Sequence, residues 1–418
     1  MSSRITLPFF LLNIIGISFY FLMMLLIGIE IDFNTLFATN DAKTYREVAH
    51  WISDGTSTES TAIRPILYPL FLVVSSKIAG VLGVWFLQFS MWLLSINFIF
   101  FTLKNVTKSV VWASIGALIL MSNLSFIALT FHALTEVATV FLLSLIIYIS
   151  VKNREQFRSF AFFRNLIFFF VLLTMVKPVF HIPLLGLIFI VLPLFYFKVL
   201  LQKWKNSLIF LLLLIPIFFQ IGLVKTKHNQ LTVSTISSKT VDEYILAQTL
   251  EDKHKFERDS ALIYVQSMTS GEKSTFIRHN FPLVVNRFTK NLEGNILSAP
   301  VYLMSYVKKP NKKLIDFMID MNAEYYKWHR YFIVLFVPFL ILLYRKKEYN
   351  LLKISLFFGL LNTYYLLATG ISFWQGDRLT FAAIGIFSFL YAFMLYAFFT
   401  FISTIIKSKL KSRDTDNE

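Results

Sequence analysis

Residues 29–70 read IEIDFNTLFATNDAKTYREVAHWISDGTSTESTAIRPILYPL and lie between two apolar segments. The stretch is rich in charged and hydroxyl side chains, which hydrocarbon cannot satisfy. It must therefore lie in water or in a polar cavity, as the first loop between membrane helices. If the protein carries out a reaction, this loop is the first place to look for the residues responsible.

The rest of the 418-residue chain is strongly apolar. Hydrophobic residues make up 56% of it, 47 of them phenylalanines, and the mean hydropathy is +0.64. This composition is typical of polytopic α-helical membrane proteins and excludes a soluble globule. The formal net charge of +16 is explained by lysines and arginines that hold loops in the cytoplasm, without nucleic acid binding. The chain has no cysteine, which excludes disulfides, thiolate metal sites and a cysteine nucleophile.

Ten apolar runs are long enough, at about 20 residues each, to cross the hydrocarbon core of a bilayer. They lie near 8–28, 83–103, 110–130, 133–151, 160–177, 180–199, 207–225, 330–345, 350–370 and 379–405. A further run at 65–80 is interrupted by Pro69 and by a Ser-Ser-Lys sequence, and we expect it to be half-inserted or interfacial. An eleventh helix remains open if 65–103 forms a tight hairpin. We therefore expect an all-α polytopic membrane protein with about 10–11 transmembrane helices.

Basic clusters predict the orientation of these helices. With the amino terminus inside, ten crossings place every cluster in the cytoplasm. The clusters are Lys104 and Lys108, then 152–164, 198–205, 345–347 and 407–413. We expect an integral protein of the bacterial inner (plasma) membrane, with both termini cytoplasmic and the first apolar run retained as a signal anchor.

Three polar regions then share the extracytoplasmic face: the first loop, a segment at about 226–330, and a short loop at 373–378. The 226–330 segment is mixed in charge, and we expect it to be helical and to lie over the outer mouth of the bundle. Its predicted apolar positions are Tyr244, Ile245, Leu250, Phe256, Phe276, Leu283, Val284 and Phe288. The chain therefore divides into a membrane module at 1–225 with the catalytic first loop at 29–70, the outer segment at 226–330, and C-terminal membrane helices with a basic tail at 331–418.

Asp41 is the sharpest candidate for chemistry in the first loop. The alternative is that Asn40 or Asp41 caps a short juxtamembrane helix running to about Asp54. Lys43 or Thr44 at the third helical position provides no capping box. The chain contains no Gly-rich phosphate loop, His-Glu-x-x-His or Gly-x-Ser-x-Gly motif. A soluble-nucleotide enzyme or a zinc hydrolase is therefore unsupported.

Three more ionic groups are expected at the same face. Lys177 precedes a proline, whose turn would leave the ammonium facing the cavity of Asp41; the alternative is a lysine that snorkels to the interface. Arg378 either contacts a ligand or pairs with the neighbouring Asp377. Glu136, at the outer start of a membrane helix, either faces the bundle interior as part of the site or has a hydrogen-bonded structural role.

Five short motifs therefore occur in order on the predicted outer face. They are Asp41…Tyr45, Arg64-Pro65…Tyr68-Pro69, Thr135-Glu136, Lys177-Pro178 and Gln375…Arg378. Their order resembles the GT-C superfamily of membrane glycosyltransferases, which includes protein O-mannosyltransferases and lipid A aminoarabinose transferases. The resemblance covers about residues 8–200 and extends more loosely to the C-terminal helices, where Leu379 replaces the tyrosine of the family's Gln-x-x-Arg-Tyr element.

The resemblance implies an inverting glycosyltransferase that moves a hexose or pentose from a polyprenyl-phosphate donor. Because the phosphate is already a good leaving group, one carboxylate is enough, as a base toward the acceptor hydroxyl. The resemblance implies Asp41 as that base and Glu136 as a second catalytic residue near the acceptor, with cations to stabilise the departing phosphate. The implied substrate-binding residues are Tyr45, Arg64, Tyr68, Lys177, Gln375 and Arg378.

The implied partners are a polyprenyl-phosphate-linked sugar, a glycan, lipid or protein acceptor of the cell envelope, and the lipid bilayer. We expect no cofactor. His132 and His181 lack a second ligand at a useful spacing, so no metal site is predicted, although the use of a divalent metal remains open.

Two alternative functions are a transporter or flippase for a lipid-linked glycan and a polysaccharide polymerase. A transporter would distribute polar residues through several helices, and a polymerase would rely on arginines in its large outer loop. The gathering of polar groups at one face favours the enzyme.

Overall fold

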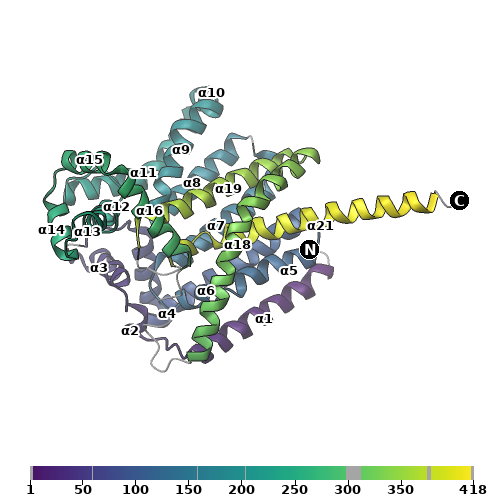
Figure 1. Ribbon diagram of the computed structural model, residues 1–418, viewed down its shortest axis with the longest axis horizontal. Helices are drawn as coiled ribbons and strands as arrows, with labels where there is room; N and C mark the ends of the chain where they lie inside the picture. Colours follow the sequence, from purple (N-terminus) through teal and green to yellow (C-terminus); the bar gives the residue numbers. More distant parts are fainter. Residues whose placement is uncertain are drawn as a thin grey trace.

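The protein is helical throughout the residues that the structure describes. The computed structural model describes residues 3–58, 60–157, 159–202, 204–297, 312–373 and 378–415. Every regular element in these ranges is an α-, 3-10 or π-helix (Figure 1). The prediction of an all-α polytopic membrane protein is therefore confirmed.

Within these ranges, seven helical segments are long and apolar enough to cross a membrane. They are α1 (Ser3–Ile27), α4 (Leu67–Thr107), α7 (Thr135–Lys152), the segment Pro178–Gln202, α11 (Trp204–His228), the segment Tyr349–Ile371 and α21 (Ile384–Thr415). The segment Pro178–Gln202 includes α9 (His181–Gly186), η3 (Leu187–Tyr196) and α10 (Phe197–Gln202). The segment Tyr349–Ile371 includes α19 (Tyr349–Ala368). Three shorter apolar helices are α5 (Val110–Met121), α8 (Phe160–Val176) and the last part of α18 (Lys312–Arg345). Each of these ten segments overlaps one of the ten predicted runs, because an apolar run by itself favours a membrane helix. The helix α5 ends at Met121, earlier than the predicted run at 110–130.

The run at 65–80 forms the short arm of a helical hairpin within α4. The backbone leaves the helical conformation just before and at Gly80, which has a φ of 57°. The two arms pack so closely that a Cβ added to Gly83 would lie 2.1 Å from the carbonyl oxygen of Ser75, and Tyr68 donates a hydrogen bond to Gln88 at 3.4 Å. The short arm has about 12 residues and rises only about 18 Å, less than the roughly 30 Å of hydrocarbon. It therefore does not complete a crossing.

The first loop contains the predicted juxtamembrane helix. Its two helices are α2 (Phe33–Leu36) and α3 (Asn40–Asp54). Thr39 caps α3 by accepting a hydrogen bond from the backbone N–H of Ala42 at 3.0 Å, and Gly55, with a φ of 78°, ends the helix in the left-handed region. Tyr45 is buried on the face that packs against α4. The charged side chains of α3 lie at the surface or face a cavity.

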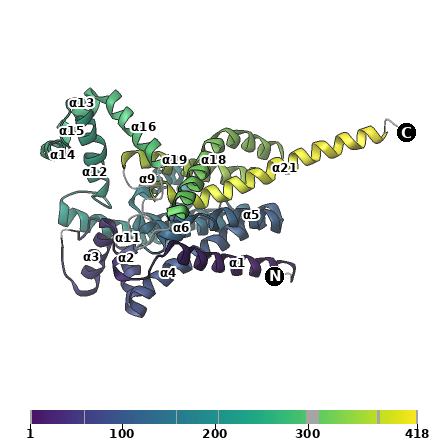
Figure 2. The ribbon, with the colours of Figure 1, turned by 60° about the horizontal axis from the view of Figure 1, so that its bottom comes forward.

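The outer segment folds into a small cluster of helices with its own core. Its elements are α12 (Ile236–Val241), η4 (Asp242–Ala247), α13 (Gln248–His254), α14 (Arg258–Ser267), α15 (Ser270–His279) and α16 (Phe281–Leu297). Five of the eight predicted apolar positions belong to this core: Ile245, Leu250, Phe276, Val284 and Phe288. Phe256 and Leu283 are exposed instead, and Tyr244 lines a cavity. In both ribbon views, α13 to α15 lie at the end of the molecule away from the chain termini (Figures 1 and 2).

The two ends of α7 have different surroundings. Near its carboxyl-terminal end, basic loops meet: Arg154 donates a hydrogen bond to Asn105 at 2.9 Å, and Asn350 donates one to Glu155 at 3.1 Å. At its amino-terminal end, Glu136 faces a polar cavity. An 18-residue helix is about 27 Å long, so the basic loops and the cavity lie at opposite ends of the bundle.

Candidate functional site

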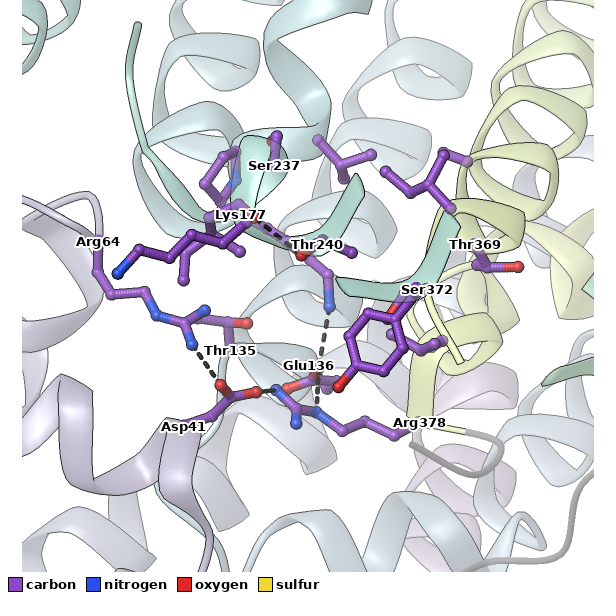
Figure 3. Close-up of a pocket in the computed structure, with 18 of the residues that line it drawn as sticks. Asp41, Arg64, Thr135, Glu136, Lys177, Ser237, Thr240, Thr369, Ser372 and Arg378 are labelled. Atoms are coloured by element: carbon purple, nitrogen blue, oxygen red, sulfur yellow. Dashed lines mark hydrogen bonds and ion pairs between the residues drawn. The ribbon is translucent and has the colours of Figure 1, made fainter. Parts of the chain in front are cut away.

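A cavity of about 320 Å³ lies where the first loop, α7, α12 and α20 (Arg378–Phe381) meet. Five ionic side chains that were predicted from the sequence line it together: Asp41, Arg64, Glu136, Lys177 and Arg378. Figure 3 shows Asp41, Arg64, Glu136 and Arg378 pointing toward one another. Tyr45 also lines the cavity, as predicted.

Asp41 projects into the cavity from the first turn of α3. Because Thr39 caps this helix, the alternative in which Asn40 or Asp41 serves as the cap is wrong. The carboxylate instead binds two guanidinium groups. Oδ1 accepts a short hydrogen bond from Arg64, and Oδ2 lies 2.6 Å from Nη2 of Arg378. The Asp41 side chain remains 24% exposed, so a molecule in the cavity can reach it.

These two arginines determine the charge state of Asp41. Burial by itself would raise the pKa of the carboxyl group. The charges of Arg378 and Arg64, and the hydrogen bonds that they donate, outweigh burial and hold the pKa of Asp41 well below its usual range. Asp41 is therefore ionised at neutral pH, and it is a weak base for as long as both guanidinium groups are bound to it.

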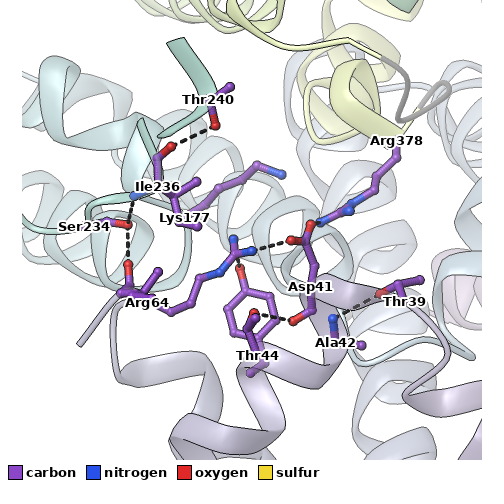
Figure 4. A network of polar contacts seen from close by, with 12 residues as sticks. Thr39, Asp41, Ala42, Thr44, Arg64, Lys177, Ser234, Ile236, Thr240 and Arg378 are labelled. Carbon is purple, nitrogen blue, oxygen red and sulfur yellow. Dashed lines mark hydrogen bonds and ion pairs between the residues drawn. The ribbon is translucent and has the colours of Figure 1, made fainter. Parts of the chain in front are cut away.

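Arg64 is positioned by a distant part of the chain. Its guanidinium donates to the hydroxyl of Tyr45 at 3.3 Å and lies 4.8 Å from the centre of that ring. The side chain of Gln220 donates to the carbonyl oxygen of Arg64 at 3.4 Å. Ser234, labelled in Figure 4, donates to the carbonyl oxygen of Ile63 at 2.6 Å. The helix α11 and its connection to α12 therefore hold the segment that carries Arg64 against the cavity.

Glu136 is completely buried in the first turn of α7 and binds two cations through one oxygen. Its Oε1 accepts hydrogen bonds from Nζ of Lys177 at 2.9 Å and from Nε of Arg378 at 2.7 Å. Its Oε2 has no hydrogen-bond partner among the described residues. Arg378 therefore links the two carboxylates, because Nε binds Glu136 while Nη2 binds Asp41.

Lys177 reaches the cavity because the chain turns where α8 ends. The helix stops at Val176, Lys177 is extended, and Pro178 begins a 3-10 turn. The side chain of Lys177 is only 15% exposed, and its ammonium lies 6.0 Å from the centre of the Tyr365 ring. The prediction that the proline would direct this lysine toward Asp41 agrees with the geometry, whereas the snorkelling alternative does not.

The charges around the cavity are unequal. Three cations face two carboxylates, so this cluster carries a net charge of +1. Lys239 adds an exposed cation at the cavity wall, whereas Glu243 there pairs with Arg258 at 3.0 Å. A cavity with excess positive charge and guanidinium donors favours an anionic ligand such as a phosphate.

Two further residues singled out in the sequence, Tyr68 and His132, lie apart from the cavity. Tyr68 is 1% exposed and packs behind Tyr45, with ring centres 5.2 Å apart, so it does not belong to the cavity wall. Gln375 and Asp377 lie outside the described residues. His132 is buried and donates a hydrogen bond to a backbone carbonyl of α2 at 2.8 Å, which agrees with a packing role.

Several cavity residues were not anticipated from the sequence. Ser237 and Thr240 line the cavity one helical turn apart on α12, and Tyr365 and Ser372 line it from the C-terminal helices. Two hydroxyl residues three positions apart are common on polar helices, so their spacing carried little signal. Within the described ranges, no group of three or more potential ligands that could hold a metal ion is found.

We compared the chain with family models, with curated proteins and with solved structures, and nothing matched in any of the three.

Proposed function

We propose that the protein is an inverting glycosyltransferase that moves a sugar from a polyprenyl-phosphate donor to a glycan, lipid or protein acceptor. The observation that carries this proposal is the clustering of Asp41, a partly exposed carboxylate, with three cations in one cavity beside membrane helices. A lipid-linked donor suits this location, because its chain can stay in the bilayer while its phosphate enters the cavity. The resemblance of the motif order to the GT-C superfamily supports the same function.

The proposed reaction is a single displacement at the anomeric carbon of the sugar. The acceptor oxygen attacks this carbon while Asp41 takes the hydroxyl proton. The bond from the anomeric carbon to the phosphate oxygen breaks, and its electron pair leaves with the polyprenyl phosphate. A positioned base of this kind contributes about 10²–10⁴-fold to the rate. Attack from the side opposite the leaving group inverts the anomeric configuration.

The cations have a distinct part in this reaction. Negative charge grows on the phosphate as it leaves, and guanidinium and ammonium groups already in place stabilise it. Arg64, Arg378 and Lys177 are such groups, since the carboxylates and the packing around them hold their side chains at the cavity. Glu136 holds two of these cations in place through its Oε1.

The ion pairs of Asp41 suggest the order of events. While both guanidinium groups bind Asp41, its pKa stays low and it accepts a proton poorly. A donor phosphate competes for the same guanidinium groups, and each hydrogen bond that moves to the phosphate raises the pKa of Asp41 toward its ordinary range. Donor binding would therefore activate the base, so that the proton is taken only when a donor is present.

We place the cavity on the extracytoplasmic side of the membrane. The basic loops around Arg154 and Asn350 lie at the other end of the bundle, and such loops are retained in the cytoplasm. Nucleotide sugars are absent outside the cytoplasm, which is consistent with a lipid-linked donor.

A second candidate, the transport of a lipid-linked glycan, is favoured by one observation. Uncharged polar side-chain atoms that have no hydrogen-bond partner among the described residues are buried in several membrane helices. They include Ser144, Thr174, Ser355, Asn362 and Ser388. Transporters do bind substrates through polar groups within their helices. The charged groups nevertheless gather in the cavity, where a phosphate would need them, and this favours the enzyme.

The decisive experiment uses the purified full-length protein in liposomes with polyprenyl-phosphate hexoses and pentoses. The proposal expects release of polyprenyl phosphate together with a new glycosidic bond of inverted configuration, which NMR of the product identifies. Product with retained configuration would contradict direct displacement. Movement of intact donor across the bilayer, with no release of polyprenyl phosphate, would instead support the transporter.

A further inference from the structure

A second pocket, of about 310 Å³, lies between α2, α3 and the hairpin of α4. Apolar side chains from all three elements line most of it, including Leu36, Phe37, Leu72 and Val84. It lies on a different face of α3 from the first cavity: Asp41 and Tyr45 line the first cavity, whereas positions 46, 49, 50 and 53 line this pocket. We call it the hairpin pocket.

The ionisable residues that line the hairpin pocket are all of basic type. Arg46, His50 and Lys77 line it, and its lining residues include no aspartate or glutamate. The guanidinium of Arg46 lies over the rings of Phe33 and Phe37, 5.1 and 5.6 Å from their centres. The buried Nε atom of Arg46 has no hydrogen-bond partner among the described residues. The pocket therefore combines an apolar interior with cations and a free donor, which is complementary to an anion that carries an apolar chain.

The surface beside the hairpin pocket is apolar and exposed. Val74, Ile78 and Leu82 surround the turn of the hairpin, with exposed fractions of 53%, 79% and 57%. Large apolar side chains that are exposed at the end of a membrane hairpin contact lipid. Lys77 is exposed among them, as is typical of residues at the level of lipid headgroups. A lipid in the bilayer can therefore reach the pocket without passing through water.

We propose that the hairpin pocket binds an anionic phospholipid of the surrounding bilayer. One acyl chain lies in the apolar interior, and the headgroup phosphate binds Arg46 and Lys77. Because the pocket is built partly from α3, the bound lipid holds that helix against the hairpin and thereby supports the position of Asp41 on its other face. The sugar donor occupies the first cavity and does not compete for this pocket.

Photo-crosslinking of the unmodified protein tests the proposal directly. The purified full chain is reconstituted with phosphatidylglycerol that carries a diazirine on one acyl chain, and labelled peptides are identified by mass spectrometry. We expect labelling concentrated in residues 33–53 and 70–84, reduced by unlabelled phosphatidylglycerol and much less by phosphatidylcholine with the same chains. Labelling spread evenly over the membrane surface, or equal competition by both lipids, would overturn the proposal. Displacement by polyprenyl phosphate alone would assign the pocket to the donor instead.

Substitutions test the two halves of the pocket separately, with lipid-dependent thermal stabilisation in detergent as the readout. Arg46→Ala and Lys77→Ala should each weaken the effect of phosphatidylglycerol about fivefold, as expected for one cation near a lipid phosphate. Ser76→Phe fills the pocket but keeps both cations, and it should also remove the effect. Lys43→Ala is the matched control, because Lys43 is an exposed cation of α3 that lines neither cavity. If Lys43→Ala weakens the effect as much as Arg46→Ala does, the lipid is attracted by overall charge and the pocket is not its site.

Discussion

The most informative single change is Asp41→Asn. Asparagine has nearly the same shape as aspartate and retains a side-chain oxygen that can accept a hydrogen bond from Arg64 or Arg378. It lacks the negative charge and cannot take a proton at neutral pH. Because Thr39 caps α3, the change removes no helix cap.

The structure indicates how large the two effects of this change should be. Arg378 keeps its 2.7 Å bond to Glu136, and Arg64 keeps its bond to Tyr45, so neither guanidinium loses every partner. We therefore expect a loss of about 1–3 kcal/mol in the free energy of unfolding, less than the roughly 3–5 kcal/mol for a buried charge with no partner left. Sugar transfer should fall by about 10²-fold or more, because the proton acceptor is gone.

The assay measures transfer of labelled sugar from a polyprenyl-phosphate donor, with thermal unfolding recorded on the same samples. Asp32→Asn is the matched control. Asp32 caps α2 by accepting a hydrogen bond from the N–H of Thr35 at 2.6 Å, and asparagine caps a helix as well as aspartate does. This control should retain wild-type transfer, because Asp32 does not line the cavity. Asp41→Glu should recover little activity, because its extra methylene moves the carboxylate by about 1 Å, which is enough to cost about 10²-fold.

The dependence of stability on pH provides an independent check. The pKa of Asp41 is depressed in the folded protein, so its ion pairs contribute stability that is complete above the unfolded pKa of about 3.9 and is lost as the pH falls toward the folded value. The stability difference between wild type and Asp41→Asn should therefore be constant from about pH 5 to 8 and shrink below about pH 4. A folded Asp41→Asn protein that transfers sugar at the wild-type rate would refute the assignment of Asp41 as the base.

Three further predictions concern other parts of the molecule. Arg378→Lys and Lys177→Ala should both raise the KM for the donor. Arg378→Lys is expected to be impaired because one ammonium cannot bind both carboxylates as the guanidinium fork does. Normal donor saturation in both variants would remove these residues from the site. Gly83→Ala should destabilise the protein by about 1–3 kcal/mol, because its Cβ would overlap the carbonyl of the facing arm, 2.1 Å away; an unchanged unfolding temperature would contradict the close packing. Reporters fused at Ser57 and at Arg345 should read extracytoplasmic and cytoplasmic respectively, and the same signal at both positions would contradict the proposed orientation.

Much of the membrane fold could be predicted because it depends on short stretches of sequence. An apolar run such as the one in α11 specifies a membrane helix without help from the rest of the chain. The turn before Pro178 could be predicted for the same reason, since proline cannot continue the helix that ends at Val176. The hairpin within α4 was left open, because a single glycine at position 80 inside apolar sequence does not reveal that the chain reverses there.

The polar contacts of the site could be predicted only in part. The residue types and the shared face followed from membrane physics, because charged groups cluster where hydrocarbon does not reach. Which charges would pair did not follow: Arg64 binds Asp41 from 23 positions away, and Gln220 holds the backbone of Arg64 from 156 positions away. Contacts at such separations depend on how the helices pack, and a single sequence carries no direct signal of them.

Arg378 brings the C-terminal part of the chain into the cavity, although most of the motifs lie in the first 200 residues. It lies at the start of α20, yet its guanidinium joins Asp41 of α3 to Glu136 of α7. Without it, the two carboxylates would face each other across the cavity with one fewer cation, which would raise the pKa of Asp41 and weaken phosphate binding. The cluster of five ionic side chains therefore has its net charge of +1 only when the C-terminal helices are docked against the first loop, and a truncated chain that ends before α18 should bind no donor even if its own helices insert correctly.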